Sequence, residues 1–263
     1  MPWKISSFED AGRWRIAAPW LGSKALKGKL SSPRRSPRIP RPTLALFDVN
    51  ETLSDLHPLR ARFEAVGARG ELLEVWFAST LRDGFALAAA GAYADFHTVA
   101  VGVLRGRLAE VETLTRDPGE AAEHIVAGFG ELDVHPDVEE GVRKLADAGV
   151  RMATLANGAA ELATKLLERG GLAHLIERRL SVDDVQRWKP ARQSYLYATR
   201  ELGVSPEHCA LIAVHPWDID GAKRAGLQTA WLNRTNSSFP NFFQPPDFTS
   251  ATLGGLAGAL LAA

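Results

Sequence analysis

Short apolar runs alternate with stretches of helical spacing along most of this chain, and this alternation constrains the fold more than any other feature. The predicted strands cover residues 44–47, 150–155, 180–182, 210–214 and 229–232, and the predicted helices cover residues 136–148, 158–169, 191–202, 219–225 and 253–263. Strands that alternate with helices of this length form right-handed βαβ units around a parallel sheet. We therefore predict an α/β fold with a parallel-sheet core.

A long segment after the first predicted strand, residues 56–132, has helical spacing and no strong strand signal. Its apolar residues recur at intervals typical of a helix face, at Leu59, Phe63, Val66, Leu72, Val75, Trp76 and Leu81. The sequence therefore predicts a helical insert over residues 56–132. Residues 43–55 and 133–263 would then form the α/β core.

The first 42 residues differ in composition from the rest of the chain. They hold ten Lys or Arg and two acids, which leaves 21 basic and 29 acidic residues for the remainder, although the net charge of the whole chain is zero. A segment rich in Lys, Arg, Ser and Pro does not bury a core. We expect a basic, disordered, non-catalytic extension, with an organelle transit peptide as the alternative.

The rest of the composition excludes several classes of protein. Cys209 is the single cysteine, so no intrachain disulfide forms, and we expect a buried thiol in a cytoplasmic protein. No apolar stretch approaches the length of a membrane span, so no membrane partner is expected. The acidic body gives no reason to expect a nucleic-acid partner.

The first predicted strand ends directly at an acidic residue, Asp48, and Thr52 follows four positions later. The carboxyl edge of a parallel sheet is where open α/β folds bind ligands, and a carboxylate there can act as a nucleophile. The alternative interpretation is an ordinary turn, since Asp, Asn and Thr are common turn residues. Three later segments favour the first interpretation: Leu-Ala-Asn-Gly at 155–158, Trp-Lys-Pro at 188–190 and His-Pro-Trp-Asp at 215–218.

The order and spacing of these four segments resemble the haloacid dehalogenase superfamily of hydrolases. Three details resemble its type II, L-2-haloacid dehalogenase branch: Asn50 in place of a second Asp, Tyr195 six residues after Lys189, and the Trp217-Asp218 pair before Gly-Ala. The resemblance covers about residues 43–250. It implies a Rossmann-like α/β core, a helical cap inserted after the first strand, and an active site at their interface.

The resemblance also implies a role for each catalytic residue. Asp48 would attack the halogen-bearing carbon of a short 2-haloacid, and water would hydrolyse the resulting ester. Lys189 would keep Asp48 ionised, because an opposite charge nearby favours a carboxylate. Thr52 would donate a hydrogen bond to Asp48, and Asp218 would orient Lys189 or help to position the hydrolytic water.

Substrate binding is expected from other positions, and several of them depart from the branch. The residues expected to contact substrate are Asn50, Asn157, Tyr195, His215 and Trp217. The cap arginine of the branch, which holds the substrate carboxylate and the halide, falls near Phe77 in this chain, and Arg82 is the candidate to replace it. Two hydroxyls of the branch are replaced by Ala156 and Ala213, and an Asn by His215.

We therefore predict a hydrolase that needs no metal or other cofactor and acts on a small-molecule substrate. One alternative is a Mg²⁺-dependent phosphatase of the same superfamily, which needs a second motif-one Asp and paired later acids. Asn50 and Ala213 occupy those places, and Asp220 is a displaced substitute. A second alternative is a non-catalytic binding protein. Relatives of the branch are often dimers, so a homodimer is an open expectation.

Overall fold

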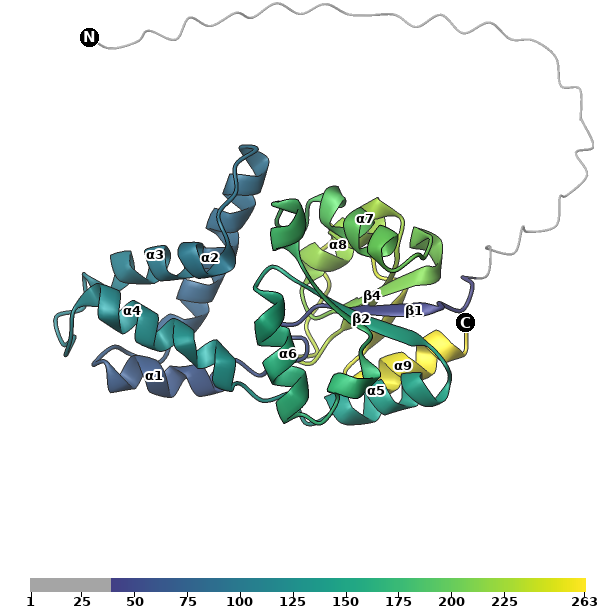
Figure 1. Ribbon diagram of the computed structural model, residues 1–263, viewed down its shortest axis with the longest axis horizontal. Coiled ribbons are helices and arrows are strands. Elements are labelled where there is room, and N and C mark those ends of the chain that lie inside the picture. The colour runs from purple at the N-terminus through teal and green to yellow at the C-terminus, as the bar shows by residue number, and fades with distance from the viewer. Residues whose placement is uncertain (1–38) are drawn as a thin grey trace, which may run out of the picture. The chain divides into compact units, whose positions relative to one another are not determined.

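Six strands form one parallel sheet in the computed structural model, which describes residues 39–263 (Figure 1). The strands are β1 (Leu44–Phe47), β2 (Arg151–Ala156), β3 (Arg178–Ser181), β4 (Cys209–Ala213), β5 (Gln228–Leu232) and β6 (Phe248–Ser250). Their order is β3-β2-β1-β4-β5-β6, and each recorded pairing is parallel. The predicted parallel α/β core is confirmed. The chain order reverses between β1 and β4, which is where such sheets open a crevice for ligands.

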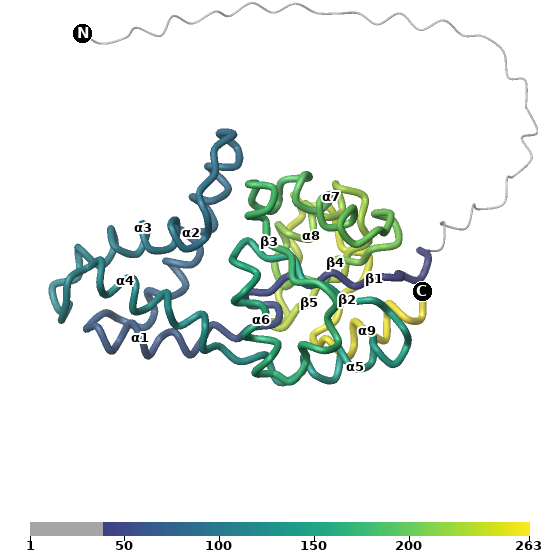
Figure 2. The backbone as a smooth tube through the Cα atoms, viewed as in Figure 1, coloured from purple at the N-terminus to yellow at the C-terminus, as the bar shows by residue number. Residues whose placement is uncertain are grey.

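Helices cover both faces of the sheet (Figure 2). On one face lie α5 (Val138–Asp147), α6 (Ala160–Arg169) and α9 (Leu253–Leu261), and on the other lie α7 (Arg192–Glu201) and α8 (Pro216–Ala225). All four residues of β1 are buried, as expected for a central strand with helices on both sides. Short 3₁₀ helices complete the connections at His57–Leu59, Ala127–Glu131, Ala173–Leu175, Val182–Val185 and Pro206–His208.

Four helices follow one another between β1 and α5, in the segment where the cap is predicted: α1 (Arg60–Ala65), α2 (Leu72–Ala89), α3 (Phe96–Leu108) and α4 (Pro118–Val126). Asp95 and Asp117 cap the amino-terminal ends of α3 and α4, because their carboxylates accept backbone N–H groups of the first turn. The four helices pack around aromatic rings, and the Trp76 indole donates a hydrogen bond to the Ala100 carbonyl. We call α1–α4 the cap helices; the exact domain boundaries stay a prediction.

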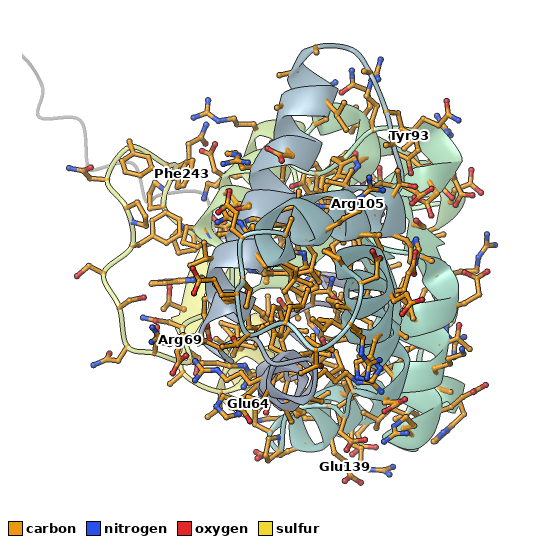
Figure 3. All side chains as sticks on the ribbon, turned by 90° about the vertical axis from the view of Figure 1, so that its left-hand side faces the viewer. Glu64, Arg69, Tyr93, Arg105, Glu139 and Phe243 are labelled. Atoms are coloured by element: carbon orange, nitrogen blue, oxygen red, sulfur yellow. The ribbon has the colours of Figure 1, made fainter. Side chains whose placement is uncertain are left out.

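Trp188 joins the cap helices to the core. Its indole nitrogen donates a hydrogen bond to the Ala94 carbonyl, and its ring stacks on Phe96 with centroids 5.9 Å apart. Gly84 of α2 lies so close that a Cβ there would sit 2.3 Å from the indole Cε3 atom. Tyr93, labelled in Figure 3, adds a hydrogen bond to the Asp183 carboxylate.

Most predicted elements are present with shifted ends, and one strand was not predicted. Helix α8 begins at Pro216 rather than at 219, and β6 was missed altogether. Cys209 is buried as expected, and burial raises the pKa of its thiol to about 12. No helix within residues 39–263 is long and apolar enough to cross a membrane. The expected disordered extension over residues 1–42 lies outside the described residues, except for 39–42.

Candidate active site

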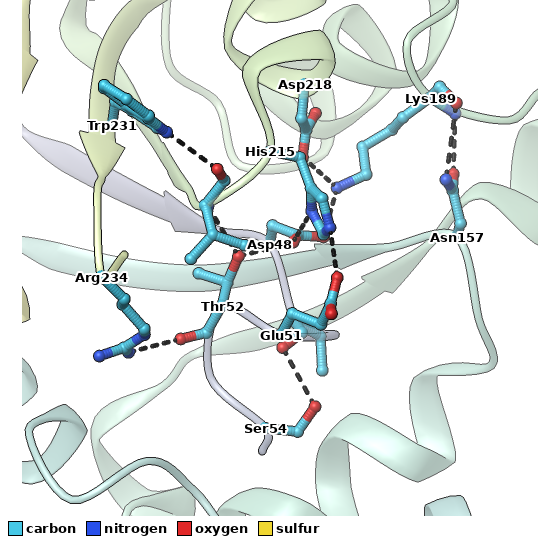
Figure 4. A network of polar contacts seen from close by, with 12 residues as sticks. Asp48, Glu51, Thr52, Ser54, Asn157, Lys189, His215, Asp218, Trp231 and Arg234 are labelled. Atoms are coloured by element: carbon cyan, nitrogen blue, oxygen red, sulfur yellow. Dashed lines mark hydrogen bonds and ion pairs between the residues drawn. The ribbon is translucent and has the colours of Figure 1, made fainter. Parts of the chain in front are cut away.

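The four segments singled out in the sequence meet at the carboxyl edge of the sheet (Figure 4). Asp48 directly follows β1, Asn157 directly follows β2, and Lys189 lies in the connection between β3 and α7. Asp218 lies in the first turn of α8, just after β4. Since parallel strands end at the same edge, residues more than 100 positions apart in the chain come into contact there.

Lys189 lies between the two carboxylates. Its Nζ atom is 2.8 Å from Oδ1 of Asp48 and 2.7 Å from Oδ2 of Asp218, and its side chain is fully buried. Burial by itself would raise the pKa of Asp48, but Lys189 and His215 overcome that effect and hold it well below its usual range. Burial would lower the pKa of Lys189, and the two carboxylates raise it. The arrangement therefore keeps an ammonium beside an ionised Asp48.

Two hydroxyl groups complete the hydrogen bonds of this ion pair. Thr52 donates to Oδ2 of Asp48 at 2.7 Å and accepts the backbone N–H of Val214 at 3.1 Å. Tyr195 donates to Oδ1 of Asp218 at 2.6 Å. Burial and the neighbouring Asp48 charge raise the pKa of Asp218 even though Lys189 lowers it. Both oxygens of Asp218 are thus occupied, one by Tyr195 and one by Lys189.

His215 lies between the carboxylates of Asp48 and Glu51 (Figure 4). Its Nε2 atom is 2.7 Å from a Glu51 oxygen, and its Nδ1 atom is 3.4 Å from Oδ2 of Asp48. Burial would lower the pKa of His215, but the nearby carboxylates of Asp48 and Glu51 raise it to about 9. The imidazole is therefore a second cation beside Asp48 when the carboxylates are ionised.

Asn157 holds the backbone of Lys189. Its Oδ1 atom accepts the Lys189 N–H at 2.8 Å, and its Nδ2 atom donates to the Lys189 carbonyl at 3.5 Å. Asn50 is half-buried and, among the described residues, its amide has no recorded side-chain hydrogen bond. Asn157 is thus committed to positioning the lysine, whereas the side-chain amide of Asn50 has no recorded hydrogen-bond partner within residues 39–263.

Aromatic rings from the cap helices and the core surround the charged groups. Trp217 stacks on His215 with centroids 5.0 Å apart, and its ring centroid is 5.9 Å from Lys189 Nζ. Phe85 of α2 meets Trp217 edge to face at 4.8 Å. Phe77, which stands where the branch has its cap arginine, lies 6.4 Å from the His215 ring. Such rings exclude water, so the charges interact more strongly than they would in solvent.

Arg82 lies apart from these groups. Its guanidinium is exposed, with a side-chain relative accessibility of 66%, and forms an ion pair with the adjacent Asp83 at 2.7 Å. No recorded contact joins Arg82 to any site residue within residues 39–263. Its expected role as a substrate clamp receives no support from this placement.

A cavity of about 390 Å³ opens beside the His215–Glu51 pair. Its lining includes Glu51, Phe77, His135, Val214, His215 and Arg234. Asp48 itself keeps only 5% of its surface exposed and does not line the cavity. The cavity therefore reaches the residues next to the carboxylate rather than the carboxylate itself.

Two residues of this region were not singled out from the sequence. Glu51 contacts His215, which lies 164 positions later, and no spacing rule joins the two. Arg234 donates a hydrogen bond to the Thr52 carbonyl at 2.9 Å and forms an ion pair with Asp137. Glu51 lies within the Asp48–Thr52 segment, and this position was the one sequence signal that could have identified it as a site residue.

The acids of the site do not gather around a common metal position. Asp220, the displaced substitute of the phosphatase alternative, pairs with Arg224 at 2.7 Å and accepts the Gln244 N–H at 2.9 Å. Within residues 39–263, no group of three or more His, Cys, Asp or Glu side chains could hold a metal ion. The described residues therefore do not offer the ligand set which that alternative requires.

The curated relatives found by comparison with known proteins are haloacid dehalogenases. A (S)-2-haloacid dehalogenase of Xanthobacter autotrophicus is 31% identical over 193 residues, which are 72% of this chain and 74% of the relative. Haloacetate dehalogenase H-2 of Moraxella sp. (strain B) is 28% identical over 205 residues, 77% of this chain and 91% of the relative. These relatives agree with the predicted resemblance to the L-2-haloacid dehalogenase branch.

Solved structures agree with this likeness. The L-2-haloacid dehalogenase from Xanthobacter autotrophicus with chloropropionic acid covalently bound has a TM-score of 0.75 and 26% identity, and the match covers 83% of this chain and 98% of that one. The family model for haloacid dehalogenase-like hydrolases matches residues 42–226. The chain therefore belongs to the haloacid dehalogenase-like hydrolase family.

Proposed function

We propose that this hydrolase cleaves the carbon–halogen bond of short 2-haloacids without a metal, through an ester on Asp48. The observation that carries the proposal is the buried Lys189 ammonium, 2.8 Å from Asp48 and 2.7 Å from Asp218. It keeps Asp48 ionised in a site that would otherwise favour the protonated acid, and an ionised carboxylate is the nucleophile that the reaction needs.

The chemistry follows from that charge arrangement. Oδ1 or Oδ2 of Asp48 attacks the carbon that bears the halogen, the carbon–halogen bond breaks, and the halide leaves with the bonding electrons. Water then hydrolyses the ester to a 2-hydroxyacid and restores the carboxylate. The covalently bound chloropropionic acid in the Xanthobacter autotrophicus relative supports such an ester. The cavity beside Glu51 and His215 is the proposed approach for substrate.

The other roles proposed from the sequence are refined by these contacts. We assign Asp218 and Tyr195 to the orientation of Lys189, since Asp218 has no free oxygen. Thr52 orients Asp48, and Asn157 fixes the Lys189 backbone. Phe77, Trp217 and the Asn50 amide remain the proposed contacts of the substrate body.

The test is halide release from chloro-, bromo- and fluoro-substituted short acids in the presence of a chelator. The wild-type chain is expected to release halide, and Asp48→Asn is expected to release none, because a neutral amide does not displace halide. Chelator-sensitive turnover of an aryl phosphate, with no halide release, would favour the Mg²⁺-dependent alternative instead. No turnover of either substrate class would favour a non-catalytic binding protein.

Three further expectations stay proposals. A cytoplasmic location fits the single cysteine. Binding of nucleic acid is not expected of the acidic body. Homodimer formation is proposed because relatives of the branch are often dimers, and size-exclusion chromatography with light scattering would test it.

A further inference from the structure

The cavity beside the nucleophile is larger than a short 2-haloacid requires. Its volume is about 390 Å³, and liquid water takes about 30 Å³ per molecule, so the cavity has room for about 13 water-sized groups. Chloroacetate and 2-chloropropionate have fewer than half as many non-hydrogen atoms, and some of these must lie against Asp48 rather than in the cavity. Most of the cavity would therefore hold no part of a short substrate.

Apolar side chains from two parts of the chain form the walls of this cavity. Leu73 and Phe77 of α2 line it on the side of the cap helices. Trp231 and Leu232, at the end of β5, line it on the side of the sheet. The Trp231 indole donates a hydrogen bond to the Val214 carbonyl at 2.9 Å, so its polar atom is satisfied and its ring acts as an apolar surface. Walls of this kind favour an apolar group of a ligand over water.

The carboxylates and the guanidinium that border the cavity are already engaged within the protein. The partners are Glu51 with His215, Glu74 with Arg60, Arg234 with Asp137, and Asp55 with the backbone N–H of His57. Burial and the charge of Arg234 lower the pKa of His135, so its ring is neutral at neutral pH. The cavity therefore offers little attraction to a substrate carboxylate and suits an uncharged group better.

The cavity begins close enough to the nucleophile for one substrate to occupy both places. The His215 ring lines the cavity, and its Nδ1 atom lies 3.4 Å from Oδ2 of Asp48 (Figure 4). Phe77 borders the same end, because its ring centroid is 6.4 Å from that of His215. A group attached to the halogen-bearing carbon can thus extend past these two rings while the carbon itself lies against Asp48.

We propose that this cavity is a subsite for the 2-substituent of the substrate, and that 2-haloacids with a bulky apolar substituent, above all an aryl group, are better substrates than 2-chloropropionate. The inference rests on the proposed dehalogenation and concerns which acid is bound, because the bond changes stay the same. Asp48 displaces the halide, and water cleaves the ester. An aryl group would contact Phe77 and Trp231, and aromatic pairs bind more tightly than their buried area alone explains.

The first test compares halide release by the wild-type chain from 2-chloropropionate, 2-chlorohexanoate and 2-chloro-3-phenylpropionate. All three acids react at a secondary carbon, so differences in kcat/KM report mainly on the substituent. Each buried methylene should raise kcat/KM by about fourfold, and the aryl acid should exceed 2-chloropropionate by about 10-fold to 100-fold. A value of kcat/KM that is constant across the series, or that falls with size, would mean that the cavity holds only water.

The second test fills the cavity from α2. Leu73→Phe should lower the ratio of kcat/KM for the aryl acid to that for 2-chloropropionate by about 10-fold or more, because the new ring takes the space of the substituent. Val75 lies on the same helix, is 48% exposed and does not line the cavity, so Val75→Phe should leave the ratio unchanged. Turnover of 2-chloropropionate by Leu73→Phe shows that the variant is folded. An unchanged ratio in that folded variant would contradict the proposed subsite.

A third measurement needs no variant and no turnover of a large acid. Halogen-free 3-phenylpropionate and propionate are compared as competitive inhibitors of 2-chloropropionate turnover by the wild type. The inhibition constant of 3-phenylpropionate should be lower by about 10-fold or more, and equal constants would overturn the inference. Halide release without any preference for the larger acids would refute the subsite alone. Absence of halide release from every acid would instead refute the proposed function.

Discussion

At the scale of single residues, the site is organised by one buried ammonium rather than by many contacts. Lys189 is fully buried, so its charge is tolerated only because Asp48 and Asp218 lie within 2.8 Å. A buried ion pair adds little net stability, because the cost of removing the charges from water offsets most of their attraction. The arrangement is therefore better explained by the chemistry proposed for Asp48 than by the stability of the fold.

The pH dependence of stability should report the charge on His215. Its pKa is about 9 in the folded chain and about 6.5 in an unfolded one, so folding favours the protonated ring. This contribution is complete below about pH 6.5, disappears as pH rises through 9, and amounts to about 3 kcal/mol at most. Urea unfolding of the wild type and of His215→Gln should therefore differ most in mild acid and converge near pH 10.

His97 provides a matched control for that measurement. It lies on α3, its side chain is 61% exposed, and it also pairs with a glutamate, Glu123. His97→Gln should change the free energy of unfolding by no more than about 0.5 kcal/mol across the same pH range. A difference for His215→Gln that stays constant with pH would mean that packing, and not charge, explains its effect.

The convergence of Asp48, Lys189 and Asp218 could be predicted from the sequence, but the partner of His215 could not. Each of the three lies in the connection after a strand or in the first turn of the helix that follows it, and parallel strands end at one edge, so their meeting needs no knowledge of packing. The His215–Glu51 pair depends on how the loop after β1 turns, including a left-handed residue that sequence patterns do not reveal. Arg82 was chosen because it follows Phe77 closely in the sequence. That distance does not show which face of the helix carries the Arg82 side chain.

At the scale of elements, the approach of α2 to Trp188 fixes how the cap helices meet the core. Gly84→Ala would place a methyl group 2.3 Å from the indole, so the ring or the helix must shift. We expect a loss of about 1–3 kcal/mol in the free energy of unfolding, despite the better helix propensity of alanine. Activity should fall as well, because Lys189 is the next residue after Trp188. Chemical denaturation and halide release would measure the two effects.

Gly102 of α3 is the matched control for that substitution. A Cβ at Gly102 would meet nothing within 4 Å, so Gly102→Ala should stabilise the chain by about 0.5–1 kcal/mol through helix propensity alone. Equal effects of the two substitutions would show that the contact between Gly84 and Trp188 does not constrain the helix.

The helices and most strands were predictable because their apolar spacing is clear, and the exceptions have physical causes. Strand β6 has three residues, Phe248–Ser250, at the edge of the sheet, and none of them is fully buried. Such a strand is fixed by backbone pairing with β5 rather than by an apolar run. Pro216 opens α8 because the first helical position needs no N–H donor, which extends the helix beyond its apolar pattern.

At the scale of the whole described chain, the cap helices and the sheet share one apolar core. A single cluster of buried residues includes Phe63 and Trp76 of the cap helices together with Phe47 and Ile212 of the sheet. Residues 39–263 also lie within one compact unit. We therefore expect the cap helices and the core to unfold in one cooperative transition, since neither part retains a complete core without the other.

Urea unfolding followed by circular dichroism and by tryptophan emission would test this expectation. Trp76 reports on the cap helices and Trp231 on the sheet, so Trp→Phe variants at each position separate the two signals. Coincident midpoints are expected. An earlier loss of the Trp76 signal would mean that the cap helices unfold independently.

The junction at Trp188 has an optical consequence. Its indole touches α2 at Gly84, donates a hydrogen bond to the Ala94 carbonyl and stacks on Phe96, while its chain neighbour Lys189 contacts Asp48. Any separation of the cap helices from the core would move this fluorophore from an apolar, hydrogen-bonded setting towards water and shift its emission to the red. The chain thus carries a built-in fluorescent reporter one residue away from Lys189 of the candidate active site, and subtraction of the Trp188→Phe spectrum would isolate its signal.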